Sequence, residues 1–487
     1  MSFEHELLAQ RHKKIRQIEE LGFAAYPHKF DFTHSLGEIR ARYDAATADE
    51  LAASRVGVRV CGRAQTVRRQ GKAGFAHLEQ GGAKLQIYVR QDAVGEKDFA
   101  LYQLLDLGDI IGVDGELRRT KTGELSIFAQ RIKILTKSLA APPEKHHGLT
   151  DPELRQRLRF LDLTYGEGVM PRFLNRTKIV RSIRETLHQR RFVEVEGPTL
   201  HSIAGGAAAR PFKTHHNTLD IDLFLRIALE LHLKRLMVGG MERVYELGRV
   251  YRNEGISQRH NPEFTMLEAY QAYGDYRSMM DLTEACIVDA IRATGQPLVL
   301  PWGDTTVDFT PPFARKTYDE VFQEHVQVDP TDAAAIAGKA KSLGLETAAK
   351  HPDVIKSEVF EVVVEKSLKG PIFVMDYPAS ICPLTKRKAD NPAVAERFEL
   401  IVEGMEIANA YTELNDPDLQ EQLFKTQLAG LADEDSMAKM DTDFIRALRH
   451  GMPPAGGLGL GIDRLVMLLT NTQSIRDVIL FPLLRPE

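Results

Sequence analysis

The spacing of apolar residues changes near Val56 from a helical period to a strand period. Residues 4–21 repeat apolar side chains at helical spacing and stop before Gly22, which predicts one helix. The polar, alanine-rich segment 40–54 predicts a second short helix. We therefore expect a helical N-terminal extension over residues 1–55.

After Val56 the period is two, which is typical of half-buried strands. Five alternating runs are separated by glycine-containing segments: Val56–Val60, Leu85–Val89, Ile110–Gly115, Leu125–Phe128 and Ile132–Leu135. Five short strands within about 80 residues predict a small closed barrel of the oligonucleotide-binding (OB) type over residues 56–139.

The second half of the chain has mixed helical and strand periods. Residues 140–150 contain two consecutive prolines and predict a linker. Residues 151–487 predict one large domain, with a helical insertion near 325–370 that is rich in alanine and lysine. The fold class is therefore α+β.

Composition narrows the class of protein. Of the 487 residues, 43% are apolar and 27% charged, which excludes a largely disordered chain. There is no run of about 18 apolar residues, so we expect no membrane segment. The three cysteines are far apart and form no CxxC pair, which argues against a thiolate zinc site or a disulfide scaffold and favours a cytoplasmic location.

The barrel segment contains candidate nucleic-acid ligands. Residues 56–135 contain 13 basic and 9 acidic residues, whereas the whole chain has a net charge of −5. Phe75 and Tyr88 are suited to stacking on bases, and Arg68, Arg69 and Lys72 to binding phosphates. The alternative is that the rings are core residues and the charges a solvated surface.

Residues 244–270 hold the densest set of chemically useful side chains. Two strand-like runs flank a loop at 255–262, which predicts a long-looped antiparallel hairpin. Alternation places Glu246, Arg252 and Glu254 on one face of the first strand. On the second strand it groups Phe264, Met266, Glu268 and Tyr270. Arginine suits phosphate oxygens and Phe264 suits a purine, although structural ion pairs would give the same pattern.

A glycine-rich run, Gly456–Gly461, precedes Arg464. Its glycines let the backbone pass close to a ligand, and the following helix leaves Arg464 at its positive end, where an anion would bind. The alternative is a turn into a packing helix. No GxxxxGK[ST] loop is present, so ATP, if used, is not held by a Walker motif.

A third group lies at residues 397–413. Asn409, Tyr411 and Glu413 share one face of a strand, and Glu406 joins them only if a β-bulge intervenes. Paired Glu399 and Glu406, without Cys or His nearby, suit a hard cation such as Mg²⁺, unless they are exposed hairpin acids.

Together these stretches resemble class II aminoacyl-tRNA synthetases and, in detail, lysyl-tRNA synthetases. Val193–Leu200 resembles motif 1, a dimer-interface element, and Tyr251–Phe264 resembles motif 2. Gly459–Arg464 resembles motif 3. The resemblance covers nearly the whole chain, including the Gly71–Phe75 turn, and implies an antiparallel catalytic sheet with flanking helices and a homodimer.

The resemblance implies a two-step reaction. Lysine and ATP give lysyl-adenylate, and the lysyl group then passes to the terminal adenosine of tRNA(Lys). It assigns catalysis to Arg252, Glu254 and Arg464, and Mg²⁺ to Glu399 and Glu406. The implied ATP ligands are Arg252, Glu254, His260, Asn261, Phe264, Glu399 and Arg464.

The same resemblance assigns the amino-acid and anticodon ligands. For lysine these are Gly206, Glu230, Glu268, Tyr270, Asn409, Tyr411 and Glu413. For the anticodon they are Arg68, Phe75, Gln86 and Glu124.

Three positions depart from the family pattern. Leu229 replaces a usual proline and adds a backbone N–H, His232 follows it, and Ala408 brings a methyl group near the pocket. A second function therefore stays open: a paralogue with an altered pocket that regulates RNA or attaches a lysine-like amino acid to another acceptor.

Overall fold

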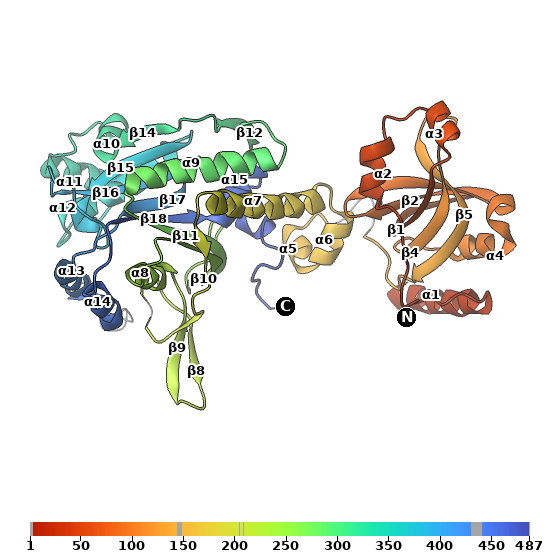
Figure 1. The fold of residues 1–487 in the computed structure, drawn as a ribbon, viewed down its shortest axis with the longest axis horizontal. Helices are drawn as coiled ribbons and strands as arrows, with labels where there is room; N and C mark the ends of the chain where they lie inside the picture. The colour runs from red at the N-terminus through yellow and green to blue at the C-terminus, as the bar shows by residue number, and fades with distance from the viewer. Residues whose placement is uncertain (1–2, 144–148, 204, 208, 430–440, 487) are drawn as a thin grey trace. The chain divides into compact units, whose positions relative to one another are not determined.

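The computed structural model describes residues 3–143, 149–203, 205–207, 209–429 and 441–486. The chain forms two compact units (Figure 1), which we call the barrel unit (Met1–Pro171) and the sheet unit (Arg172–Glu487). Residues 144–148 of the predicted linker lie outside the described residues, and the boundary between the units falls later in the chain, within helix α7 (Val169–Gln189).

The barrel unit contains a closed five-stranded barrel with the strand order β1-β2-β3-β5-β4, which confirms the prediction. Its strands are β1 (Gly57–Gln70), β2 (Ala73–Gln80), β3 (Ala83–Arg90), β4 (Ile110–Arg119) and β5 (Leu125–Thr136). Its helices are α1 (Phe3–Glu20), α2 (Leu36–Tyr43), α3 (Ala48–Ser54), α4 (Gln91–Leu104), α5 (Pro152–Arg157) and α6 (Arg159–Tyr165).

The strand count is right, but the strands themselves were partly wrong. The last two predicted runs form one strand, β5, because Gln130 between them is an extra residue opposite β4, a bulge rather than a turn. Strand β2 was missed because its inward positions include Gly74 and Ala76, which give almost no hydrophobic alternation.

The single helix predicted at 40–54 is also wrong, because the segment contributes to two helices. Ser35 caps α2 together with Glu38, and Thr47 caps α3 together with Glu50. Each pair is a capping box, which satisfies the first free N–H groups of a helix and starts it at a defined residue.

The sheet unit is built on an eight-stranded, mostly antiparallel sheet with the order β14-β15-β16-β17-β18-β11-β10-β6. Its strands are β6 (Val193–Glu194), β10 (Arg243–Tyr251), β11 (Glu263–Ala272), β14 (Ala314–Thr317), β15 (Ile372–Pro378), β16 (Val394–Val402), β17 (Met405–Thr412) and β18 (Ala455–Gly461). Shorter strands form two small sheets: β7 (Leu200–His201), β8 (Lys213–His216) and β9 (Ile221–Leu225), and β12 (Val299–Trp302) with β13 (Thr305–Asp308).

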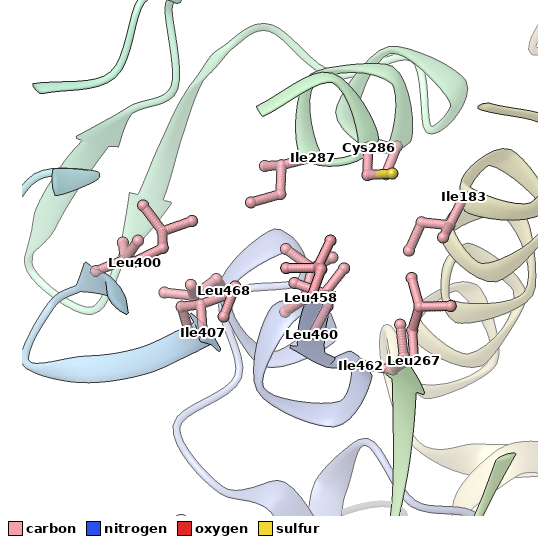
Figure 2. Close-up of a cluster of buried hydrophobic side chains, with 14 of the residues drawn as sticks. Ile183, Leu267, Cys286, Ile287, Leu400, Ile407, Leu458, Leu460, Ile462 and Leu468 are labelled. Carbon is pink, nitrogen blue, oxygen red and sulfur yellow. The ribbon is translucent and has the colours of Figure 1, made fainter. Parts of the chain in front are cut away.

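One face of this sheet carries the main hydrophobic core (Figure 2). Helices α7, α9 (Tyr276–Ala293) and α15 (Ile462–Leu469) pack there against inward side chains such as Leu267, Leu458 and Leu460. On the other side lie α8 (Glu230–Val238) and α14 (Thr442–Leu448), whose apolar residues cluster with Tyr270 and Ala272; α13 (Pro417–Ala429) precedes α14. A 3₁₀ turn follows α15 at Ile475–Asp477.

The region near 325–370 is helical. Helices α10 (Tyr318–Val326), α11 (Ala333–Ser342) and α12 (Pro352–Val359) are followed by a π-turn at Phe360–Val364 and a 3₁₀ turn at Glu365–Ser367; another 3₁₀ turn, Ala379–Ile381, follows β15. These helices share a core cluster with β15 and the edge of β16. In the described part of the chain, no helix has the length and apolarity needed to cross a bilayer.

Candidate active site

A cavity of about 620 Å³ lies on the face of the large sheet opposite the main core. Strand β11 shows how the two faces are separated. Leu267 and Ala269 belong to the core, whereas Met266, Glu268 and Tyr270 line the cavity. The predicted face of the second hairpin strand is therefore the floor of a pocket.

The glycine-rich run is a central strand of that floor and not a turn. In β18, Leu458 and Leu460 point into the core, and the alternate glycines line the cavity between β11 and β17. A Cβ atom on Gly457 would lie 2.6 Å from the Tyr270 ring and would collide with Glu413. The glycines are needed because side chains from both neighbouring strands converge over them.

Strand β17 contains the predicted bulge. Leu400 pairs with Ala408 but the next residue, Ile401, pairs with Glu406, so Ile407 is the extra residue. The bulge brings Glu406 to the cavity side together with Asn409 and Tyr411.

Two arginines lie at one end of the cavity. The Arg252 guanidinium lies 5.2 Å from the centre of the Phe264 ring. Arg464 donates to the Glu406 carbonyl at 2.8 Å, and its Nη2 lies 3.2 Å from His260 Nε2. Burial and the Arg464 charge lower the pKa of His260, which favours the neutral imidazole.

The predicted face of the first hairpin strand is wrong. Strand β10 ends at Tyr251, so Arg252 and Glu254 belong to the loop and reach the cavity from there. Glu246 lies within the strand and makes a buried ion pair with Arg226 at 2.5 Å. The alternation rule fails here because it holds only while the backbone stays extended.

The same end holds the predicted metal ligands. Glu399 pairs with Arg397 at 2.5 Å, but burial and the nearby Glu406 charge raise the pKa of Glu399. Asn261 donates to the Glu263 carbonyl at 2.7 Å, while its own side-chain oxygen is buried with no hydrogen-bond partner among the described residues.

Three buried glutamates gather at the other end: Glu230 and Glu268 line the cavity, and Glu413 is fully buried and is not among the lining residues. Glu268 accepts hydrogen bonds from the Tyr270 hydroxyl and the Leu229 N–H, each at 3.0 Å. Burial and the Glu230 charge raise the pKa of Glu268 to about 7. Gly205 and Gly206 line the cavity beside these acids.

Sequence reasoning missed Lys234. Its ammonium is fully buried, 2.5 Å from Glu230 Oε1 and in ion-pair contact with Glu413 Oε2. Burial alone would lower the pKa of Lys234, but the two carboxylates raise it. The sequence did contain a signal. Lys234 follows Glu230 by four residues, so both lie on the same face of a helix that also buries leucine and methionine side chains.

The three departures have distinct locations. Leu229 supplies the N–H that Glu268 accepts, a bond that proline cannot make. The His232 ring lies tilted against the His201 ring with ring centres 4.5 Å apart, beside a small separate cavity of about 130 Å³. Ala408 belongs to the hydrophobic core cluster and is also among the residues that line the cavity.

On the barrel, the predicted anticodon residues Arg68, Phe75 and Gln86 lie on the neighbouring strands β1, β2 and β3, and Glu124 directly precedes β5. Phe75 is half-buried and stacks on Tyr88 with ring centres 4.6 Å apart, and Gln86 donates to Glu124 at 2.8 Å. Arg68 is exposed at the end of β1. Two further side chains join them: Phe128 lies edge-on to Tyr88, and His77 lies 3.1 Å from Glu124. His77 was missed together with its strand, β2.

The chain is similar to proteins of one family over nearly its whole length. Residues 151–485 match the model of tRNA synthetases class II (D, K and N), and residues 58–135 match that of an OB-fold nucleic acid binding domain. Relatives named lysine–tRNA ligase include those of Moorella thermoacetica, 51% identical over 99% of both chains, and Thermoanaerobacter sp., 49% identical over 99% of this chain and 97% of the relative. A third, from Shouchella clausii, is 47% identical with the same coverage.

Proposed function

The chain belongs to the class II tRNA synthetases and, within them, to the lysine–tRNA ligases, and on this premise we propose how its own residues act. It is an aminoacyl-tRNA synthetase. Lysine and ATP form lysyl-adenylate and pyrophosphate, and the lysyl group then passes to tRNA. The observation that carries the residue assignment is that one cavity is lined both by Arg252 and Arg464 and by the buried carboxylates Glu230 and Glu268.

Arg252 and Arg464 hold the triphosphate in this proposal. The lysine carboxylate attacks the α-phosphate, so negative charge builds up where Arg252 donates, and Arg464 neutralises the γ-phosphate side. Phe264 stacks on the adenine, while Glu254, His260 and Asn261 orient the nucleotide. Positioning and charge neutralisation suffice, and no protein nucleophile is needed.

Glu399 and Glu406 would hold Mg²⁺. Two carboxylates fit this ion because Mg²⁺ keeps several waters and takes its other ligands from the phosphates. Burial and then the Glu406 charge raise the pKa of Glu399, and a cation between the two carboxylates would offset both effects. When bound, Mg²⁺ would neutralise phosphate charge.

Lysine occupies the acidic end. Its ε-ammonium meets Glu230, Glu413 and Tyr270, and its α-ammonium meets Glu268 and the Gly206 backbone. Asn409 and Tyr411 line the space between. Charge-assisted hydrogen bonds from a buried ammonium to carboxylates are the strong kind that distinguishes lysine from neutral amino acids.

The partners extend beyond the pocket. Phe75, with Gln86, Glu124 and Arg68, reads the anticodon of tRNA(Lys) by stacking and edge contacts. Two copies pair through the segment containing Val193 and Leu200, whose side chains are about half exposed. The enzyme works in the cytoplasm, as its free cysteines suit a reducing compartment.

Lysine-dependent exchange of pyrophosphate into ATP tests the assignment. Arg252→Ala should lower the exchange rate about 100-fold or more, the usual cost of losing a donor to a developing charge. Arg249→Ala is the matched control, because Arg249 lies three residues earlier, on β10, pairs with exposed Glu263 and is not among the described residues that line the cavity. Similar losses in both variants would remove Arg252 from the active site.

A further inference from the structure

At the acidic end of the cavity, an internal cation divides the carboxylate oxygens into two sets. The Lys234 ammonium forms ion pairs with Glu230 Oε1 and Glu413 Oε2. Glu230 Oε2 accepts the Tyr411 hydroxyl at 3.0 Å, and Glu413 Oε1 has no hydrogen-bond partner among the described residues. One oxygen of each glutamate is thus held by Lys234; the second oxygen of Glu230 has only the Tyr411 hydroxyl as donor, and that of Glu413 has none among the described residues.

The charges at this end match those of the substrate. With every group ionised, Glu230, Glu268 and Glu413 carry three negative charges and Lys234 one positive charge. The net charge of these four groups is therefore −2. The two ammonium groups of lysine carry +2 and would neutralise it. Without Lys234 the site would hold one uncompensated buried carboxylate, which is costly.

Lys234 is also fixed in place. Its side chain is fully buried, and the Tyr411 and Phe444 rings lie 5.6 and 5.9 Å from the ammonium. Of the three charged groups, Glu230 lines the cavity, whereas Lys234 and Glu413 are fully buried and are not among the described lining residues. Lys234 therefore acts on the substrate through the carboxylates that it holds, Glu230 first.

Resting on the proposed function, we propose that Lys234 is a positioning and specificity-determining residue of the lysine pocket. Its ammonium fixes Glu230 and Glu413 and cancels one of their charges, so that the pocket is neutral only when an amino acid with two ammonium groups is bound.

Three variants test this balance through the KM for lysine in pyrophosphate exchange. Lys234→Met leaves the acidic end at −3 and Glu413→Gln leaves it at −1, and we expect each to raise the KM about tenfold or more. The double variant returns to −2. Lys234→Met should therefore raise the KM in the wild-type background but lower it in the Glu413→Gln background.

A residue that only supports the fold would not reverse the sign of its effect, and additive losses in the double variant would overturn the proposal. If Lys234→Met does not fold, Glu413→Gln and the double variant still give the decisive comparison, because the double variant removes both charges of the Lys234–Glu413 pair and only Glu230 loses its ammonium partner. Lys356→Met is the control: Lys356 is also buried and pairs with Asp319 at 2.6 Å, away from the cavity.

Discrimination gives a second readout. 6-Hydroxynorleucine has a hydroxyl group in place of the terminal ammonium, and Glu413→Gln should narrow the preference for lysine over it by about tenfold. An unchanged preference would contradict the charge match. Wild-type enzyme that shows no exchange with lysine would overturn the proposed function itself, whereas normal wild-type exchange with an unaltered KM in Lys234→Met would overturn only the role of Lys234.

Discussion

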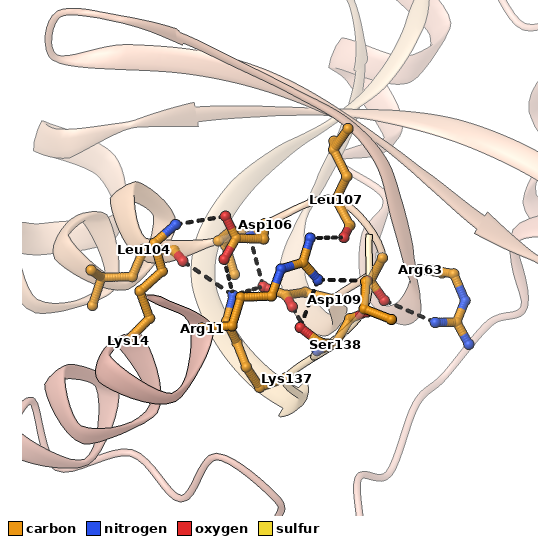
Figure 3. Close-up of polar contacts among 12 residues, drawn as sticks. Arg11, Lys14, Arg63, Leu104, Asp106, Leu107, Asp109, Lys137 and Ser138 are labelled. Carbon is orange, nitrogen blue, oxygen red and sulfur yellow. Dashed lines mark hydrogen bonds and ion pairs between the residues drawn. The ribbon is translucent and has the colours of Figure 1, made fainter. Parts of the chain in front are cut away.

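Each unit of this protein contains a fully buried lysine between two carboxylates, but the two clusters differ in how completely those carboxylates are paired. In the barrel unit (Figure 3), Lys137 lies 2.6 Å from Asp106 and 2.7 Å from Asp109. The second oxygen of Asp106 accepts a hydrogen bond from Lys14 Nζ, and that of Asp109 accepts one from the Ser138 N–H. Every carboxylate oxygen of this cluster therefore has a donor.

In the sheet unit, by contrast, Lys234 leaves Glu413 Oε1 without a hydrogen bond from any described residue. The pKa values of the carboxylates differ between the two clusters in the same way. Burial alone would raise the pKa of Asp106, but Lys137 and Lys14 lower it, whereas burial and Glu230 raise that of Glu413. A saturated cluster stabilises the fold, and an unsaturated one beside a cavity is prepared for a ligand.

The largest expected effect is on the barrel. Lys137→Met should lower the free energy of unfolding of the barrel unit by about 3–5 kcal/mol, because it leaves the fully buried Asp109 carboxylate without a cation, whereas Asp106 keeps Lys14. Pyrophosphate exchange by the folded enzyme should keep its lysine KM. Thermal unfolding and pyrophosphate exchange measure the two quantities, and Lys133→Met is the control because Lys133 is exposed on β5, four residues before Lys137. A raised lysine KM would break the distinction between the clusters.

The next effect concerns tRNA. Phe75→Ala removes a stacking platform worth about 1–3 kcal/mol per base, so the KM for tRNA should rise by about 5- to 150-fold. Adenylate formation, measured by pyrophosphate exchange, should be unchanged because Phe75 belongs to the other unit. Phe32→Ala, which removes an exposed ring outside the barrel strands, is the control. Equal losses in both reactions would contradict the separation of roles.

The two clusters should also respond to pH in opposite windows. The pKa of Glu268 is raised to about 7 and that of Glu413 is raised too, so the empty pocket binds protons that lysine displaces. Thermal stabilisation by lysine should therefore grow from pH 6 to 8, by up to about 1.4 kcal/mol per pH unit for each proton released. Lys234, Glu230, Tyr270 and Tyr411 face these groups.

The pH dependence of the stability of the empty enzyme follows from the direction of each pKa shift. The raised carboxylates of the sheet unit contribute most below pH 4.5 and lose that contribution as the pH rises through about 7. Asp106 has a lowered pKa, so its contribution is present above pH 3.8 and is lost as the pH falls further. If the thermal stabilisation of the enzyme by lysine stays constant from pH 6 to 8, lysine binding does not release protons from these carboxyl groups.

The smallest effect sharpens the role of one backbone donor. Leu229→Pro removes the backbone N–H that donates a hydrogen bond to Glu268. Leu229→Ala also replaces the leucine side chain but keeps this N–H. Losing one hydrogen bond to a charged group costs about 1.5–3 kcal/mol, part of which the Tyr270 hydroxyl offsets. The lysine KM of the proline variant should exceed that of the alanine variant by about threefold or more. Equal values would show that the bond is irrelevant to binding.

Local patterns predicted much of the fold. The closed barrel, the β10–β11 hairpin and the bulge at Ile407 all follow from strand alternation, because side chains on an extended backbone switch faces at every residue. The same rule failed at Arg252 and at Gln130, where the backbone leaves the extended form or gains a residue. Family resemblance named the pocket residues, but their geometry was beyond it.

By itself, the sequence determined which side chains share a strand face and which segments resemble known motifs, since both depend on near neighbours along the chain. Only the tertiary structure decided that Lys234 would meet Glu413, 179 residues later, because that contact depends on how α8 packs against the end of β17. It also decided which buried charges are fully paired and which keep an oxygen for a ligand, because hydrogen bonding in the interior is settled by every element that closes around it.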